Sequence, residues 1–114
     1  MDSRIQMAIS TIQNRFSREI VIDQLARKAN ISASHLRHLF KLETGLTLTQ
    51  YIKLIRMQKA EQLLLTTFLS VKEIMNRVGI KNESYFSREF KRAFGLAPLQ
   101  YRNSVERPGK KQPR

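Results

Sequence analysis

The chain has 114 residues, which is enough for one domain or for two very small ones that share a core. Its 21 Lys and Arg against 9 Asp and Glu give a formal charge of +12, which favours a polyanionic partner, nucleic acid or an anionic membrane surface, over charge that only aids solubility. The absence of cysteine excludes disulfides and thiolate metal sites, and no apolar run approaches the ~20 residues of a membrane span or forms a signal-peptide core, so we expect a cytoplasmic protein that does not span a membrane.

Apolar residues recur at helical spacing along the chain, and no stretch alternates as a strand would. We therefore predict an all-α protein with about seven helices. In chain order, the predicted helices span residues 3–16, 23–29, 33–44, 48–67, 71–78, 83–94 and 98–103. Gly45 and Gly95 end the third and the sixth of these, and Pro98 suits the first turn of the last.

Two pairs of these helices have the turn residues of a helix-turn-helix, at about 21–45 and about 71–95. In the first pair, Asn30 tolerates the left-handed conformation that ends a helix, and Ser32 is a favoured cap for the next helix. In the second pair, Asn82 stands 50 residues after Ser32 and is the equivalent cap. The sequence therefore predicts the same motif twice.

The second half of the chain also repeats the first residue by residue. The offset is 49 up to Ile31 and 50 from position 36 onward, so one residue is inserted just after Ile80. The repeated pairs include Leu36 and Phe86, Phe40 and Phe90, Lys41 and Lys91, Gly45 and Gly95, and Tyr51 and Tyr101. A unit repeated at this interval is a supersecondary module used twice. The uninterrupted helix at about 48–67 joins the modules within one domain over 1–103, and the composition of residues 104–114 indicates a basic disordered tail.

The second helix of a helix-turn-helix is the element that lies in the major groove of DNA, so its outward residues are the candidate site. Small polar residues near the helix start permit close approach, and an Arg can pair with guanine through two hydrogen bonds. The candidate base contacts are Ser34, Arg37, His38, Ser84, Ser87 and Arg88. The candidate phosphate contacts are Lys41, Asn82 and Lys91, because positioning contacts come from the flanks. The alternative for each is an ordinary solvated side chain.

No grouping of residues indicates a metal centre or a catalytic site. His35 and His38 are the only histidines, and without cysteine the chain lacks the three or four ligands that zinc requires. His35 aligns with Tyr85 in the repeat and is expected to be a partly buried packing residue. The chain has no glycine-rich phosphate loop, and no serine, histidine and acid that a fold would bring together. We expect neither an enzyme nor a cofactor.

Four motifs of the second half stand in a fixed order. They are Arg56-Met57-x-x-Ala60-x-x-Leu63-Leu64, Ile74-x-x-x-Val78-Gly79-Ile80, Ser84-Tyr85-Phe86-Ser87-Arg88-x-Phe90-Lys91 and Gly95-x-x-Pro98-x-x-Tyr101-Arg102. Together they resemble the C-terminal DNA-binding domain of the AraC/XylS family of bacterial transcription regulators, and the resemblance covers residues 4–103. Three departures are mild: Met75 replaces a small residue, Ile80 replaces Phe, and Asn30 replaces Gly.

The resemblance implies two helix-turn-helix subdomains joined by a long central helix, in a sequence-specific regulator that binds double-stranded promoter DNA. By family habit it implies an activator that touches RNA polymerase. A helix of about 20 residues is roughly 30 Å long, close to the ~34 Å between successive major-groove faces, so one monomer is expected to occupy two grooves. Many such regulators add a sensing or dimerisation domain. The chain is either a stand-alone regulator or excised from a longer one, and any dimerisation is expected through a domain not present here.

Two other classes of function fit the composition. An architectural DNA-binding or RNA-binding protein without sequence preference accounts for the charge but not for two capped recognition helices with matching outer faces. A helical adaptor whose basic faces meet an acidic protein is the second class. Binding to promoter and random DNA across a salt series separates them, because purely electrostatic binding falls alike on every sequence as salt rises.

Overall fold

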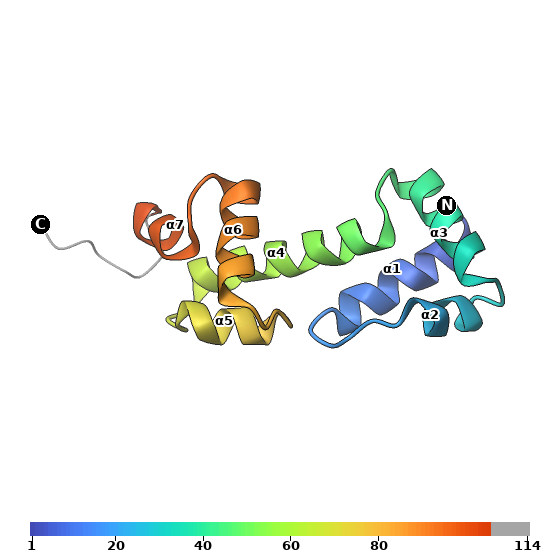
Figure 1. Cartoon of the computed structure of the whole chain (residues 1–114), viewed down its shortest axis with the longest axis horizontal. Helices are drawn as coiled ribbons and strands as arrows, with labels where there is room; N and C mark the ends of the chain where they lie inside the picture. Colours follow the sequence, from blue (N-terminus) through green and yellow to red (C-terminus); the bar gives the residue numbers. More distant parts are fainter. Residues whose placement is uncertain (106–114) are drawn as a thin grey trace, which may run out of the picture. The chain divides into compact units, whose positions relative to one another are not determined.

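The computed structural model describes residues 1–105, and these residues form seven helices and no strand (Figure 1). In chain order the helices are α1 (Ser3–Arg15), α2 (Ile22–Lys28), α3 (Ala33–Thr44), α4 (Leu48–Thr66), α5 (Val71–Arg77), α6 (Glu83–Phe94) and α7 (Pro98–Ser104). The all-α prediction is confirmed, and no predicted helix end is more than one residue from the observed one. The predicted tail begins inside α7 at Ser104, and residues 106–114 lie outside the described residues.

The chain forms two compact units, the first from Met1 to Ile55 and the second from Arg56 onward. The boundary lies within α4, so this helix contributes its first part to one unit and its remainder to the other. Each unit contains one helix-turn-helix, α2 and α3 in the first and α5 and α6 in the second. Among the described residues, no helix has both the length and the apolar character needed to cross a membrane.

In the first unit, α2 and α1 both pack against α3 over an apolar core. The buried residues of this core are Ile5, Ala8, Ile12, Leu25, Ala26, Leu36, Phe40 and Leu48. Phe40 is fully buried. Its ring packs edge to face with the ring of Tyr51, and the two ring centroids are 5.4 Å apart. Burying an aromatic ring of this size is a main source of stability in so small a unit.

The turn of the first helix-turn-helix has the geometry that its residues predict. Asn30 has φ 58°, the left-handed conformation that ends α2. The hydroxyl oxygen of Ser32 accepts a hydrogen bond from the backbone N–H of His35 at 3.0 Å and so caps α3. Both predictions are confirmed, and together these two residues fix where α3 begins.

In the second unit, α5 packs against α6 and α6 against α7. Phe90 is fully buried among three other rings, with centroid distances of 5.9 Å to Phe86, 4.6 Å to Phe94 and 5.5 Å to Tyr101. This cluster holds the inner face of α6, as Phe40 holds the inner face of α3. The Tyr101 hydroxyl donates to Glu61 Oε2 at 2.5 Å, which ties α7 to α4 and raises the pKa of the phenol.

The C-terminal end of α4 is closed by a buried arginine. Arg102 on α7 donates from Nε to the carbonyl oxygen of Leu64 at 3.1 Å and from Nη2 to that of Thr67 at 3.3 Å. The last carbonyls of a helix have no partner within it, so a guanidinium both satisfies them and offsets the negative end of the helix dipole. This arginine is therefore structural.

Candidate nucleic-acid interface

The outer face of α3 is small and polar at its start and basic further along. Its exposed residues include Ser34, His35, Arg37, His38 and Lys41. Leu36 and Phe40 on the opposite face are fully buried, which fixes the helix about its own axis. Within residues 1–105, neither Arg37 nor Lys41 forms an ion pair. Their charged groups are therefore free to meet a polyanion.

The packing role predicted for His35 is wrong. Its side chain is exposed on the first turn of α3, and the equivalent Tyr85 on α6 is exposed as well, at 38%. The repeat alignment correctly paired the two positions, but both lie on the outside of their helices. His35 therefore lies on the same exposed helix as the predicted base contacts.

The outer face of α6 follows the same plan. Ser84, Arg88 and Lys91 are exposed, and Ser87 is half-buried. Asn82 caps the helix, because its Oδ1 accepts a hydrogen bond from the N–H of Tyr85 at 2.8 Å. The cap uses the amide oxygen and leaves the NH₂ of this exposed side chain as the group that can donate to a phosphate.

Glu89 on α6 is a residue that sequence reasoning missed. Only 7% of its side chain is exposed, and its Oε2 lies 3.2 Å from Arg92 Nη1 and 3.9 Å from Arg88 Nε. A carboxylate this close to two guanidinium groups restricts the rotamers of both arginines. In the sequence, Glu89 directly follows Arg88 and precedes Arg92 by three residues. This spacing does not reveal that the acid is buried.

Tyr85 gives Arg88 a second neighbour. The guanidinium carbon of Arg88 lies 5.9 Å from the centroid of the Tyr85 ring, at the outer limit of a cation–π contact. Tyr85 also acts electrostatically on the half-buried Arg56 of α4, where burial lowers the pKa of the guanidinium and Tyr85 opposes that change. Arginine still stays protonated at neutral pH. Arg88 is thus exposed but flanked by a ring and a carboxylate.

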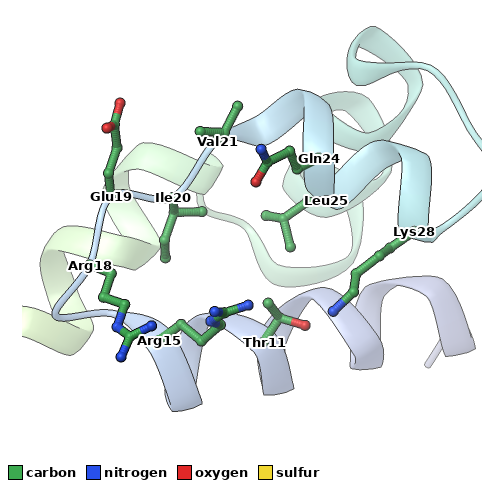
Figure 2. Close-up of a pocket in the computed structure, with 9 residues that line it drawn as sticks. All are labelled: Thr11, Arg15, Arg18, Glu19, Ile20, Val21, Gln24, Leu25 and Lys28. Atoms are coloured by element: carbon green, nitrogen blue, oxygen red, sulfur yellow. The ribbon is translucent and has the colours of Figure 1, made fainter.

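The first unit contains a hollow of about 220 Å³ between α1, the connecting segment 16–21 and α2 (Figure 2). It is lined by apolar and charged side chains, and none of the predicted DNA contacts is among them. Within residues 1–105, no three His, Cys, Asp or Glu side chains are grouped so as to hold a metal ion.

Comparison with known proteins identifies the fold. A helix-turn-helix domain family model matches residues 25–104. The lactose operon transcription activator of Staphylococcus xylosus is 34% identical over 99 residues, which are 87% of this chain and 36% of that protein. The chain spans about a third of the length of the curated relatives it matches.

Two solved structures match over nearly their whole length. The C-terminal domain of AraT, a response regulator from Geobacillus stearothermophilus, has 34% identity and a TM-score of 0.88 over 97% of this chain and 93% of that one. A Chromobacterium violaceum transcriptional regulator described as AraC-type DNA-binding has 25% identity and a TM-score of 0.85 over 94% and 96%. The chain therefore belongs to the AraC/XylS family of DNA-binding transcription regulators.

Proposed function

We propose that the chain is a sequence-specific regulator of transcription that binds promoter DNA by inserting α3 and α6 into successive major grooves. The observation that carries the proposal is that both recognition helices have the same construction. Each is capped by a side chain at its start, held by a fully buried phenylalanine, and exposed along a small-then-basic face. A major groove is wide enough for such a helix, and its base edges carry the pattern that an arginine distinguishes.

The length of α4 supports the use of two grooves. The helix has 19 residues, which at 1.5 Å per residue is about 28 Å. That length is comparable with the ~34 Å of one DNA turn. One monomer with a domain over 1–103 would then bind two half-elements about 10 base pairs apart on one face of the duplex.

The proposed roles follow the exposure of the side chains. Arg88 pairs with a guanine in one half-element, and Ser84 and Ser87 let the helix approach closely. In the other half-element the base contacts are Ser34, Arg37 and His38. The proposed phosphate contacts are Lys41, Lys91 and the free amide NH₂ of Asn82.

Activation is proposed from the likeness to a relative that is an activator by name, the Staphylococcus xylosus protein. An activator of this kind would act in the cytoplasm and contact RNA polymerase while bound at a promoter. The chain itself is proposed to bind as a monomer, because two different recognition helices suit a site that is not a palindrome.

In vitro selection of the preferred DNA site tests the proposal. Binding to the selected site and to random DNA is then compared by gel shift across a salt series. A specific regulator keeps its preference as salt rises, although both affinities fall. Equal loss of affinity on both DNAs, with no site enriched by selection, would instead identify a non-specific nucleic-acid-binding protein.

A further inference from the structure

The hollow of Figure 2 has the size of a small-molecule site. Its volume is about 220 Å³, and a protein cavity of about 150 Å³ is large enough for benzene. The hollow therefore has room for an apolar body of about one ring together with a small polar head group. It lies wholly within the first unit, so its shape depends only on α1, α2 and the segment that joins them.

The lining combines an apolar side with a cationic edge. Ile20, which is half-buried, supplies apolar surface, and the nearly buried Leu25, 4% exposed, also lines the hollow. Arg15 and Lys28 extend toward the hollow from α1 and α2, and the Lys28 ammonium lies on the same side as the Thr11 hydroxyl (Figure 2).

The charge of the lining is one-sided. Arg18 adds a third cation, whereas the one lining carboxylate, that of Glu19, extends away from the other charged groups (Figure 2). Within residues 1–105, Arg15 and Lys28 form no ion pair. The hollow therefore has an excess of positive charge beside an apolar surface.

A simpler explanation accounts for only part of this arrangement. Arg15 and Lys28 stand in the last turns of α1 and α2, where cations offset the negative end of a helix dipole. Arg27 is also in the last turn of α2 but does not line the hollow. The helix dipole thus accounts for basic residues at these ends, but it does not require two of them to line one hollow with Leu25.

We infer that this hollow binds a small organic anion, with a carboxylate or phosphate head group and an apolar body of about one ring. The head group would meet Arg15 and Lys28, and the apolar body would lie against Ile20 and Leu25. Leu25 belongs to the same buried cluster as Leu36 and Phe40 of α3, so the ligand would bind against the core that holds the first recognition helix. A ligand that binds the folded unit stabilises it by mass action. The inference does not depend on the proposed DNA binding.

Titration of the isotope-labelled full chain, followed by the backbone amide signals in NMR spectra, tests the inference with phenyl phosphate as the probe. Phenol carries the ring without the charge, and inorganic phosphate carries the charge without the ring. Phenyl phosphate is expected to shift the signals of Thr11, Leu25 and Lys28 saturably, and each control compound is expected to bind much more weakly. Equal shifts with inorganic phosphate, spread over the basic surface, would overturn the inference in favour of general anion attraction.

Variants that remove positive charge from the hollow provide a second test of the inference. The double variant Arg15→Gln and Lys28→Gln is expected to weaken phenyl phosphate binding by about tenfold or more, because it removes both charged partners of the head group. Arg27→Gln is the matched control, with the same change in the same helix turn, and it is expected to keep the affinity of the parent. A circular dichroism spectrum establishes that each variant folds. Equal weakening in Arg27→Gln would overturn the inference.

A DNA phosphate is the other anion that these cations could meet. In that case the double variant would weaken DNA binding and reduce its salt dependence, while phenyl phosphate would leave the signals of the hollow unchanged in the parent. That pair of results would also overturn the inference. Failure of the DNA selection experiment would leave it standing, since the titration contains no DNA.

Discussion

In α3, Arg37 and Lys41 form no ion pair within the described residues, whereas in α6 a nearly buried carboxylate lies within 4 Å of two arginines. The repeat makes the origin of this difference visible. Glu89 of α6 corresponds to Leu39 of α3, and Arg92 corresponds to Leu42. The two helices thus share their caps and their buried faces but differ in how their basic side chains are held.

This difference bears on the cost of binding DNA. An arginine that is already restricted by a carboxylate and a ring loses less rotamer entropy when it pairs with a base. An arginine or histidine in open solvent pays more of that entropy on binding. We therefore expect α6 to have the stricter base preference and α3 the looser one.

The largest expected effect tests the buried phenylalanine that α3 and α6 each contain. Phe40→Ala and Phe90→Ala should each lower the free energy of unfolding by roughly 3–5 kcal/mol, because each leaves a cavity in a close-packed core. Phe90 contacts three other rings and should give the larger loss. Chemical denaturation measures both. A loss below about 1 kcal/mol in either variant would mean that its ring is not the anchor of that unit.

The next effect tests base preference. Arg88→Ala should weaken binding to the selected site by about 1–3 kcal/mol and relax the preference at one base position, because a guanine loses two hydrogen bonds. His38→Ala, at the equivalent position of α3, should cost less. Lys91→Ala is the control for charge, since it should weaken all sequences alike and reduce the salt slope by about one. An unchanged ranking of sites in Arg88→Ala would contradict base recognition by that residue.

The caps allow stability and phosphate binding to be separated. Asn82→Ala and Ser32→Ala should each cost about 1 kcal/mol of stability, since each removes the hydrogen bond that starts a recognition helix. Asn82→Ser keeps a capping oxygen but has no amide NH₂. It should therefore melt like the parent and still bind DNA less tightly. Parent-like DNA affinity in Asn82→Ser would remove Asn82 from the phosphate contacts.

The smallest expected effect tests the carboxylate of Glu89, which distinguishes α6 from α3. Glu89→Gln keeps the shape of the side chain but removes the charge that restrains Arg88 and Arg92. We expect the preference at the Arg88 base position to fall several-fold, while affinity for random DNA rises with the added positive charge. Selectivity measured on a set of single-base variants of the site reports both. A rise in affinity for random DNA with an intact base preference would contradict a restraining role for Glu89.

The helices could be predicted from the sequence because their ends carry distinctive residues. Ser32 and Asn82 are caps, Asn30 takes a positive φ, and Gly45 and Gly95 end α3 and α6 with φ of 78° and 89°. These are local effects, and local sequence is sufficient to identify them.

The sequence did not predict the surroundings of two side chains, His35 and Glu89. The repeat matched His35 with Tyr85 but carried no information on burial, and both residues are exposed. Glu89 occupies an inward position at which helical periodicity predicts an apolar residue. The nearly buried carboxylate of Glu89 is tolerated because Arg92 and other groups of the fold interact with it. The spacing of residues along the sequence does not predict these interactions.

Footprinting of one bound monomer on its selected site tests whether the two unlike helices α3 and α6 occupy successive grooves. We predict two protected major-groove patches about 10 base pairs apart on one face of the DNA, with unlike sequences beneath them. Arg88→Ala should alter the protection of one patch only. Protection of a single groove segment, or a strict requirement for an inverted repeat bound by two chains, would contradict this prediction.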